Sequence, residues 1–119
     1  HRLSTIKNAD IIAVVENEKI EQALQYIEEH YAEKLKNDDI AAALHVDTRY
    51  LSRLFAKHVD MSPYQYLTQY RIDRAIAELK NGHSVAETAY MCGFQTENAF
   101  RIAFKKLLGC SPTAMAKKN

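Results

Sequence analysis

The chain has 119 residues, 47% of them hydrophobic and 26% charged, with 3 Gly and 2 Pro, a composition that fits one globular domain or two very small ones. Two cysteines without metal-ligand spacing favour a reduced, intracellular protein, and no apolar run approaches the ~20 residues that span a membrane, nor does any segment read as a signal peptide. The net charge of +1 conceals an asymmetry that favours a polyanionic partner for the second part: residues 1–45 carry 5 Lys or Arg against 9 Asp or Glu, and residues 46–119 carry 11 against 6.

Residues 1–17 give the weakest pattern, and we interpret them as a linker or the remnant of an upstream domain. The apolar run "IIAVV" (11–15) fits a strand or a helical turn. After residue 17 almost everything has helical periodicity. A first helix is expected over 18–35, because apolar residues form one stripe there: Ile20, Leu24, Ile27, Tyr31 and Leu35.

Cap residues predict the remaining helices and an all-α fold of about seven helices. Residues 37–39 offer N-caps for a helix over 39–45, and Asp47 or Thr48 caps a helix over about 48–59. Ser62-Pro63 opens a long helix that ends near Lys80, before the C-cap pair Asn81-Gly82. "SVAE" (84–87) is a capping box, Thr96 caps a helix over 96–108, and the last Ser-Pro opens a final turn. We place one subdomain at 18–81 and a second at 82–119.

One pattern occurs twice. "YLSRLFAKHVDMSP" (50–63) has a counterpart in "AFRIAFKKLLGCSP" (99–112), at an offset of 49. Ala41 corresponds to Ala89 at an offset of 48, so the offset changes by one residue within the turn. Each copy reads as a short helix, a tight turn and a second helix, which predicts a double helix-turn-helix. Proteins built of helical hairpins show similar repeated patterns even when they have other functions. A helical protein-interaction module without DNA binding therefore stays open, with an acidic first helix as its face: Glu21, Glu28, Glu29 and Glu33.

The second helix of each unit carries basic residues opposite its apolar side. In the first unit we expect these residues to face inward: Leu51, Leu54, Phe55 and His58; and these outward: Arg49, Ser52, Arg53, Ala56 and Lys57. In the second unit the inward set is Phe100, Ala103, Phe104, Leu107 and Leu108, and the outward set is Asn98, Arg101, Ile102, Lys105 and Lys106. Arg and Asn near the start of such a helix suit guanine and adenine edges in the major groove, and lysines further along suit phosphates. The connecting helix, roughly 25 Å long, is compatible with adjacent grooves ~34 Å apart.

Two stretches carry a family pattern of many fixed spacings: "IAAALHVDTRYLSRLFAKHVDMSPYQYLTQYRIDRAIAELK" (40–80) and "SVAETAYMCGFQTENAFRIAFKKLLGCSP" (84–112). They closely resemble the DNA-binding region of the AraC/XylS family of bacterial transcription regulators, over roughly residues 20–112. The resemblance implies two helix-turn-helix units joined by a long helix, which insert recognition helices (about 48–59 and 96–108) into adjacent major grooves of double-stranded promoter DNA.

The resemblance also implies roles for individual residues. It assigns base contacts to Arg49, Ser52, Arg53, Glu97, Asn98 and Arg101. Phosphate contacts are expected from Thr48, Lys57, Lys105 and Lys106. The chain departs from the family at Ile102, where Arg is usual. Either the Ile side chain packs on a thymine methyl group, or this half contributes mainly non-specific contact. The chain departs again at Met115-Ala116, where Tyr-Arg is usual, so we expect a shorter or looser last helix and a first unit that dominates specificity.

Enzyme chemistry and a cofactor are not expected. The five histidines share no metal-ligand spacing, and Cys92 is expected to pack in the second turn. "HRLSTIKNAD" (1–10) resembles the switch-histidine loop of ABC-transporter ATPase domains, but no Gly-rich phosphate loop accompanies it, so we treat it as coincidence or as the tail of an upstream helix. The family resemblance further implies RNA polymerase as a partner, an upstream effector-binding or receiver domain that can dimerise, and a cytoplasmic, nucleoid-associated location.

Overall fold

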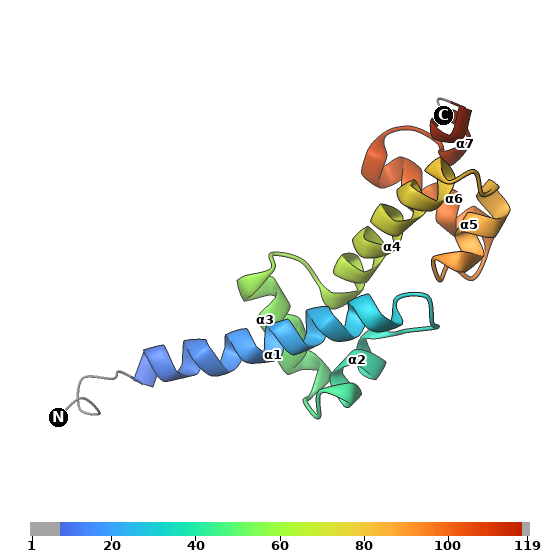
Figure 1. Ribbon diagram of the computed structural model, residues 1–119. Coiled ribbons are helices and arrows are strands. Elements are labelled where there is room, and N and C mark those ends of the chain that lie inside the picture. Colours follow the sequence, from blue (N-terminus) through green and yellow to red (C-terminus); the bar gives the residue numbers. More distant parts are fainter. Residues whose placement is uncertain (1–7, 118–119) are drawn as a thin grey trace. The chain divides into compact units, whose positions relative to one another are not determined.

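The computed structural model describes residues 8–117 and places them in helices, with no strand in that range (Figure 1). The helices in chain order are α1 (Asn8–His30), α2 (Asn37–Ala43), α3 (Thr48–His58), α4 (Pro63–Lys80), α5 (Val85–Met91), α6 (Glu97–Leu108) and α7 (Pro112–Lys117). The expected all-α fold is thereby confirmed. Most of the stretch that resembles a switch-histidine loop, residues 1–7, lies outside the described residues.

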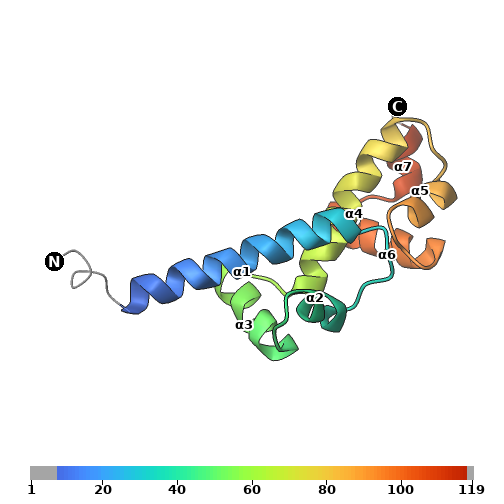
Figure 2. The ribbon, with the colours of Figure 1, turned by 60° about the horizontal axis from the view of Figure 1, so that its bottom comes forward.

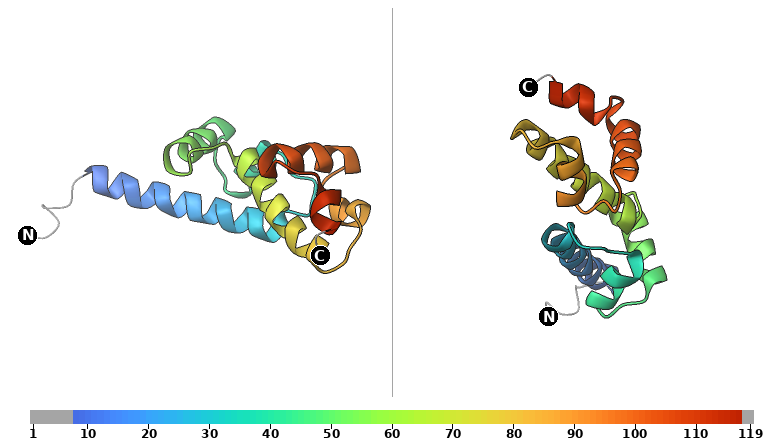
Figure 3. Two further views of the ribbon diagram at one scale, coloured as in Figure 1. Left: turned by 90° about the horizontal axis from the view of Figure 1, so that it is seen from above. Right: turned by 90° about the vertical axis from the view of Figure 1, so that its right-hand side faces the viewer.

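The helices form two compact units. Unit 1 contains residues 8–29 and 36–63, and unit 2 contains residues 30–35 and 64–117. Within unit 1, α1 lies alongside α2 and α3 (Figure 2). Within unit 2, α5 and α6 lie against α4, and α7 packs beside α5 and α6 (Figure 3). Each unit therefore contains one helix-turn-helix, α2–α3 or α5–α6.

The core of unit 1 forms where the apolar stripe of α1 meets the helix-turn-helix. Its buried side chains are Ile20, Ala23, Ile27, Ile40, Ala41, Leu44, Leu51, Leu54 and Phe55. Helix α1 begins at residue 8 rather than at the expected residue 18, so the run 11–15 is helical. The core stripe does not extend into that run, because Ile11 and Val14 are 50% and 62% exposed. The sequence pattern therefore indicated the packed part of α1 and missed its exposed first turns.

Helix α1 also ends five residues earlier than expected, at residue 30 rather than 35. The buried guanidinium of Arg71 on α4 explains this end. Its Nε donates to the carbonyl oxygen of Tyr31 and its terminal nitrogen to that of Glu33, each at 2.8 Å. These carbonyls are therefore satisfied by a side chain instead of by further turns of the helix.

Side-chain caps fix most other helix starts as predicted. Asp47 Oδ1 accepts from the Arg49 backbone N–H at 2.8 Å, and Thr96 Oγ1 accepts from the Ala99 N–H at 3.0 Å. Ser84 and Glu87 form a reciprocal capping box at 3.0 Å in both directions. Helix α2 differs from the prediction, since it covers 37–43 rather than 39–45. The reason is that Asp39 does not cap from outside but lies inside the first turn and accepts from the Lys36 N–H at 2.8 Å.

The core of unit 2 is a single apolar cluster. Its buried members are Ile72, Ala75, Leu79, Ala89, Cys92, Phe94, Phe100 and Phe104. Phe100 links the aromatic rings, with its centroid 5.2 Å from that of Phe94 and 5.6 Å from that of Phe104. Leu107 and Leu108, expected to face inward, are 41% and 38% exposed. The buried face of α6 ends at Phe104, since neither Leu107 nor Leu108 belongs to the apolar cluster or packs against it.

Candidate nucleic-acid interface

The two helix-turn-helix turns share one hydrogen-bond pattern. The Val46 N–H donates to the Ala41 carbonyl at 3.0 Å, and the Phe94 N–H donates to the Ala89 carbonyl at the same distance. His45 and Gly93, at the equivalent turn position, both have positive φ angles of 58° and 93°. These pairs keep an offset of 48, whereas the N-caps Asp47 and Thr96 differ by 49. The extra residue of the second copy therefore lies between Phe94 and Thr96.

In the first unit α3 presents the outward face that the sequence predicted. Leu51, Leu54 and Phe55 are buried, and Ser52 is partly exposed. Arg49, in the first turn of the helix, and Arg53, in its middle, are exposed. The Arg53 guanidinium carbon lies 5.6 Å from the centroid of the Tyr50 ring, within cation–π range. Tyr50, which the sequence reasoning missed, thus limits the conformations of Arg53 without neutralising it.

The last turn of α3 departs from the prediction. His58 is not part of the apolar core but contacts Glu16 of α1, with Nε2 3.0 Å from the Glu16 Oε1 atom. Lys57 Nζ donates to the same oxygen at 2.9 Å. These contacts lower the pKa of the Glu16 carboxyl, first through Lys57 and then through His58. Glu16 gave no signal in the sequence, because it is 41 residues from Lys57.

At the start of α3, Thr48 is also engaged within the unit. Its hydroxyl donates to Asp38 Oδ1 of α2 at 2.9 Å. The hydroxyl oxygen retains lone pairs for a further donor, but the proton is already used. The predicted phosphate residues of unit 1 are therefore both held by acidic side chains in this structure.

In the second unit Arg101, a predicted base-contacting residue, forms hydrogen bonds to two neighbouring side chains. Its Nε donates to Glu97 Oε2 at 2.8 Å, and a terminal nitrogen donates to Thr113 Oγ1 of α7 at 3.0 Å. Asn98 is exposed one residue after Glu97, and Ile102 is 61% exposed beside it. The predicted pair of base-reading residues, Glu97 and Arg101, is thus brought together as an ion pair.

The free positive charge therefore differs between the recognition helices. Arg49 lies in the first turn of α3 and Arg53 in its middle, and neither has an acidic partner among residues 8–117. In α6 the exposed lysines come late, at Lys105 and Lys106, and the earlier Arg101 is neutralised by Glu97. The arginines of the first face can form bidentate contacts to base edges, and the lysines of the second are better suited to the phosphates of a DNA backbone.

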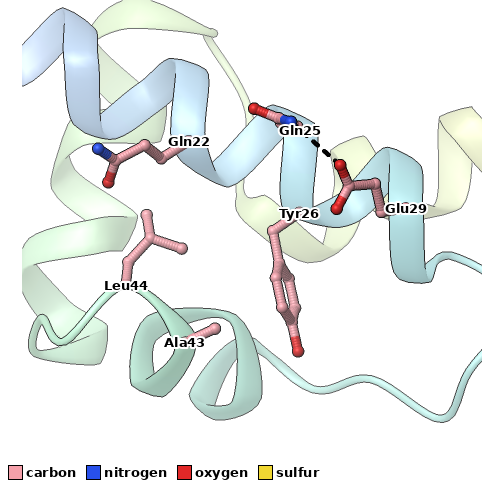
Figure 4. Close-up of a pocket in the computed structure, with 6 residues that line it drawn as sticks. All are labelled: Gln22, Gln25, Tyr26, Glu29, Ala43 and Leu44. Carbon is pink, nitrogen blue, oxygen red and sulfur yellow. Dashed lines mark hydrogen bonds between the residues drawn. The ribbon is translucent and has the colours of Figure 1, made fainter.

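Unit 1 also contains a hollow. It has a volume of about 250 Å³ and lies between α1 and the end of α2 (Figure 4). Its lining consists of Gln22, Gln25, Tyr26, Glu29, Ala43 and Leu44. Gln25 Nε2 donates to Glu29 Oε1 at 3.0 Å along one wall, as Figure 4 shows. None of the predicted base- or phosphate-contacting residues lines it.

Metal sites, membrane-spanning helices and reactive thiols each require particular side chains or segments. Within that range no three His, Cys, Asp or Glu side chains gather as a metal site, and no helix is both long and apolar enough to span a bilayer. Cys92 is buried in the cluster of unit 2, and burial raises the pKa of its thiol to about 11. The thiol is therefore neutral and shielded at physiological pH, which agrees with a packing role.

Comparisons with known proteins agree with this arrangement. A family model described as "Helix-turn-helix domain" matches residues 40–118. The HTH-type transcriptional activator RhaS of Salmonella schwarzengrund is 34% identical over 95 residues, which are 79% of this chain and 34% of that protein. The chain therefore spans about a third of the length of that curated relative.

Solved structures show the same fold. The C-terminal domain of AraT, a response regulator from Geobacillus stearothermophilus, aligns with a TM-score of 0.81 and 30% identity over 85% of each chain. The DNA-binding domain of AdpA, a global transcriptional factor crystallised with a target DNA, aligns with a TM-score of 0.77 and 30% identity, covering 81% of this chain and 87% of that one. An AraC-type regulator from Chromobacterium violaceum aligns with a TM-score of 0.79 and 25% identity over 88% of this chain and 95% of that one.

Proposed function

Because the chain belongs to the AraC family of helix-turn-helix DNA-binding domains, which are not enzymes, we propose that it binds promoter DNA by sequence and thereby regulates transcription. The observation that carries this proposal is the outward face of α3. Arg49 and Arg53 stand exposed on a helix whose opposite side is packed by Leu51, Leu54 and Phe55. A helix held in this way can enter a major groove with two cations forward.

In the proposed complex α3 reads bases through Arg49, Ser52 and Arg53. Two Arg forks favour guanine, which offers the O6 and N7 acceptors, and the Ser hydroxyl accepts or donates at a neighbouring base. The Tyr50 ring beneath Arg53 supports this role, because a guanidinium held in place loses less conformational entropy when it binds.

The second recognition helix contributes differently. Asn98 suits an adenine edge, and Ile102 suits a thymine methyl group, so this helix favours A·T pairs. Glu97 and Arg101 contact bases only if their ion pair opens or is shared with the DNA. Lys105 and Lys106 supply phosphate contacts, as do Thr48 and Lys57 in the first unit.

Salt dependence tests this proposal. We expect a gel shift on a pool of random-sequence duplexes at low salt, and a steep loss of binding when the salt concentration is raised. In vitro selection from the same pool is expected to enrich a defined operator. A chain that shifts no duplex at low salt would contradict the proposal and leave a protein-interaction module as the alternative.

We also propose that the chain acts as the DNA-binding part of a longer regulator in the bacterial cytoplasm, near the nucleoid and RNA polymerase. Two findings support this view: the match to RhaS covers 34% of that protein, and the AraT structure is the C-terminal domain of a response regulator. An upstream effector-binding or receiver domain would then control DNA binding and dimerisation.

A further inference from the structure

We propose that Glu16 competes with DNA phosphate groups for Lys57, so that the first turns of α1 control a backbone contact of the first recognition helix. This inference rests on the proposed function, because it needs Lys57 to contact DNA. Its starting point is the shared oxygen of Glu16, which accepts from Lys57 Nζ at 2.9 Å and lies 3.0 Å from His58 Nε2.

The Glu16 carboxylate contacts two side chains of α3. Its side chain is only 14% exposed, and Lys57 and His58 hold the pKa of its carboxyl below the ordinary value. It is therefore ionised at neutral pH and closely paired. The Lys57 side chain, in contrast, is 61% exposed, so its ammonium group can turn from Glu16 toward an approaching phosphate.

Glu16 marks the point at which α1 starts to contact the rest of unit 1. Residues 8–15 are all exposed, Glu16 is the first residue of the helix that is not, and the first buried one is Ile20. A second polar contact of α1 follows at Lys19, whose Nζ donates to the Leu44 carbonyl oxygen at 3.3 Å. A displacement of the exposed turns would therefore break the contact with α3 before it disturbed the core.

The Glu16 carboxylate should weaken the attraction between Lys57 and DNA. A carboxylate beside Lys57 offsets the positive charge that a phosphate would meet, and it repels the phosphate itself. DNA and Glu16 then bind Lys57 in competition. By thermodynamic reciprocity, a change that weakens the Glu16 contact strengthens DNA binding, and DNA binding loosens the first turns of α1.

The test is a set of charge variants of the full chain, assayed on a random-sequence duplex over a range of salt concentrations. Glu16→Gln is expected to raise the association constant by about two- to fivefold, which is the scale of one partly exposed ion pair. Glu18→Gln, two residues further along α1 and exposed, is the matched control for loss of one negative charge and should have a smaller effect. In a Lys57→Ala background the Glu16→Gln effect should fall to that of Glu18→Gln, because only the general repulsion between carboxylate and phosphate then remains.

Lys57→Ala alone separates the inference from the proposed function. It should reduce the slope of log K against log salt by about 0.9, the value for one phosphate contact. An unchanged slope, or a Glu16→Gln effect equal to that of Glu18→Gln, would overturn the inference while leaving DNA binding intact. Absence of DNA binding by the unaltered chain would overturn both.

Hydrogen exchange on the unaltered chain provides a check that needs no variant. Amides of residues 8–16 should exchange faster when DNA is bound, because the Glu16 contact is released. Equal or slower exchange in this segment would contradict the competition, whatever the stability of the Glu16 variant.

Discussion

Arg53 is the side chain on which the proposed base readout depends most. It is exposed, has no acidic partner among residues 8–117, and lies over the Tyr50 ring. Arg53→Ala should weaken binding to the selected operator by about 1–3 kcal/mol and relax the preference for one base pair. The measurement is a titration of the operator and of random-sequence DNA at one salt concentration.

Arg101→Ala is the comparison within the same chain. Glu97 already pairs with Arg101 at 2.8 Å, and this ion pair must be broken before Arg101 can contact DNA. The free energy of breaking it offsets part of the Arg101–DNA interaction, so Arg101→Ala should weaken operator binding less than Arg53→Ala does. If Arg53→Ala weakened operator and random DNA equally, Arg53 would be a phosphate contact instead.

The thiol of Cys92 gives unit 2 a specific response to alkaline pH. Burial, followed by the nearby Glu78 carboxylate, raises its pKa to about 11, against 9.0 for an ordinary thiol. In the unfolded chain the thiol ionises near its ordinary pKa, so between pH 9 and 11 the unfolded state binds fewer protons than the native state. The free energy of unfolding should therefore fall in this interval, by about 1–2 kcal/mol from this group.

Urea unfolding at several pH values, with two cysteine variants, isolates this effect from the tyrosines and lysines that titrate nearby. The alkaline loss should be smaller in Cys92→Ala and unchanged in Cys110→Ala. A loss of the same size in both variants and in the unaltered chain would show that Cys92 does not contribute.

At the scale of elements, Gly93 fixes how the turn of the second helix-turn-helix meets the segment after α1. Its φ is +93°, and an added Cβ would meet the Tyr31 carbonyl oxygen and approach Arg71 Nε to 2.9 Å. The left-handed conformation alone costs an L residue about 1–2 kcal/mol. Gly93→Ala should cost more than about 3 kcal/mol, since backbone atoms must also move.

Gly82→Ala is the control for the conformational part of that cost. Gly82 has nearly the same φ, +94°, but nothing lies within 4 Å of its added Cβ. It ends α4 in a Schellman motif, in which the His83 N–H donates to the Glu78 carbonyl at 3.2 Å. The difference between the two losses of unfolding free energy, measured in urea, gives the steric term; equal losses would mean that the Tyr31–Arg71 contact yields easily.

The helix boundaries show which features a sequence can and cannot indicate. Caps are local, so Asp47, Ser84 and Thr96 predicted the starts of α3, α5 and α6. The end of α1 was missed because it depends on Arg71, a residue 40 positions away from the carbonyl that it binds. One signal existed, since Arg71 lies on the same stripe of α4 as the buried Leu67 and Ala75.

The sequence likewise predicted some features of the candidate interface and missed others. Periodicity placed Arg49, Arg53, Asn98 and Ile102 outward, because the helical wheel needs only neighbouring residues. It did not indicate that Glu97 pairs with Arg101 and Thr113, nor that Glu16 binds Lys57, since those contacts depend on rotamers and on other helices. Whether a charged side chain is free to bind DNA therefore depends on tertiary contacts, whereas the side of the helix on which it lies follows from the local sequence.

At the scale of the whole molecule, two unequal recognition helices on one chain predict an operator with two unequal halves. The exposed arginines are on α3, whereas α6 offers Asn98, Ile102 and late lysines. Once the first helix has bound, the second is present at high effective concentration, so it adds affinity even with little base readout. We expect scrambling of the half bound by α3 to weaken binding about tenfold or more, and scrambling of the other half to weaken it only severalfold.

The half bound by α3 can be identified independently, because only there should Arg53→Ala remove the difference between the selected and the scrambled sequence. Scrambling keeps every phosphate in place, so the slope of log K against log salt should be the same for all these duplexes. Scrambled DNA outside both halves serves as the control. Equal losses from the two halves would mean that the Glu97–Arg101 pair opens on DNA and that α6 reads bases as strongly as α3.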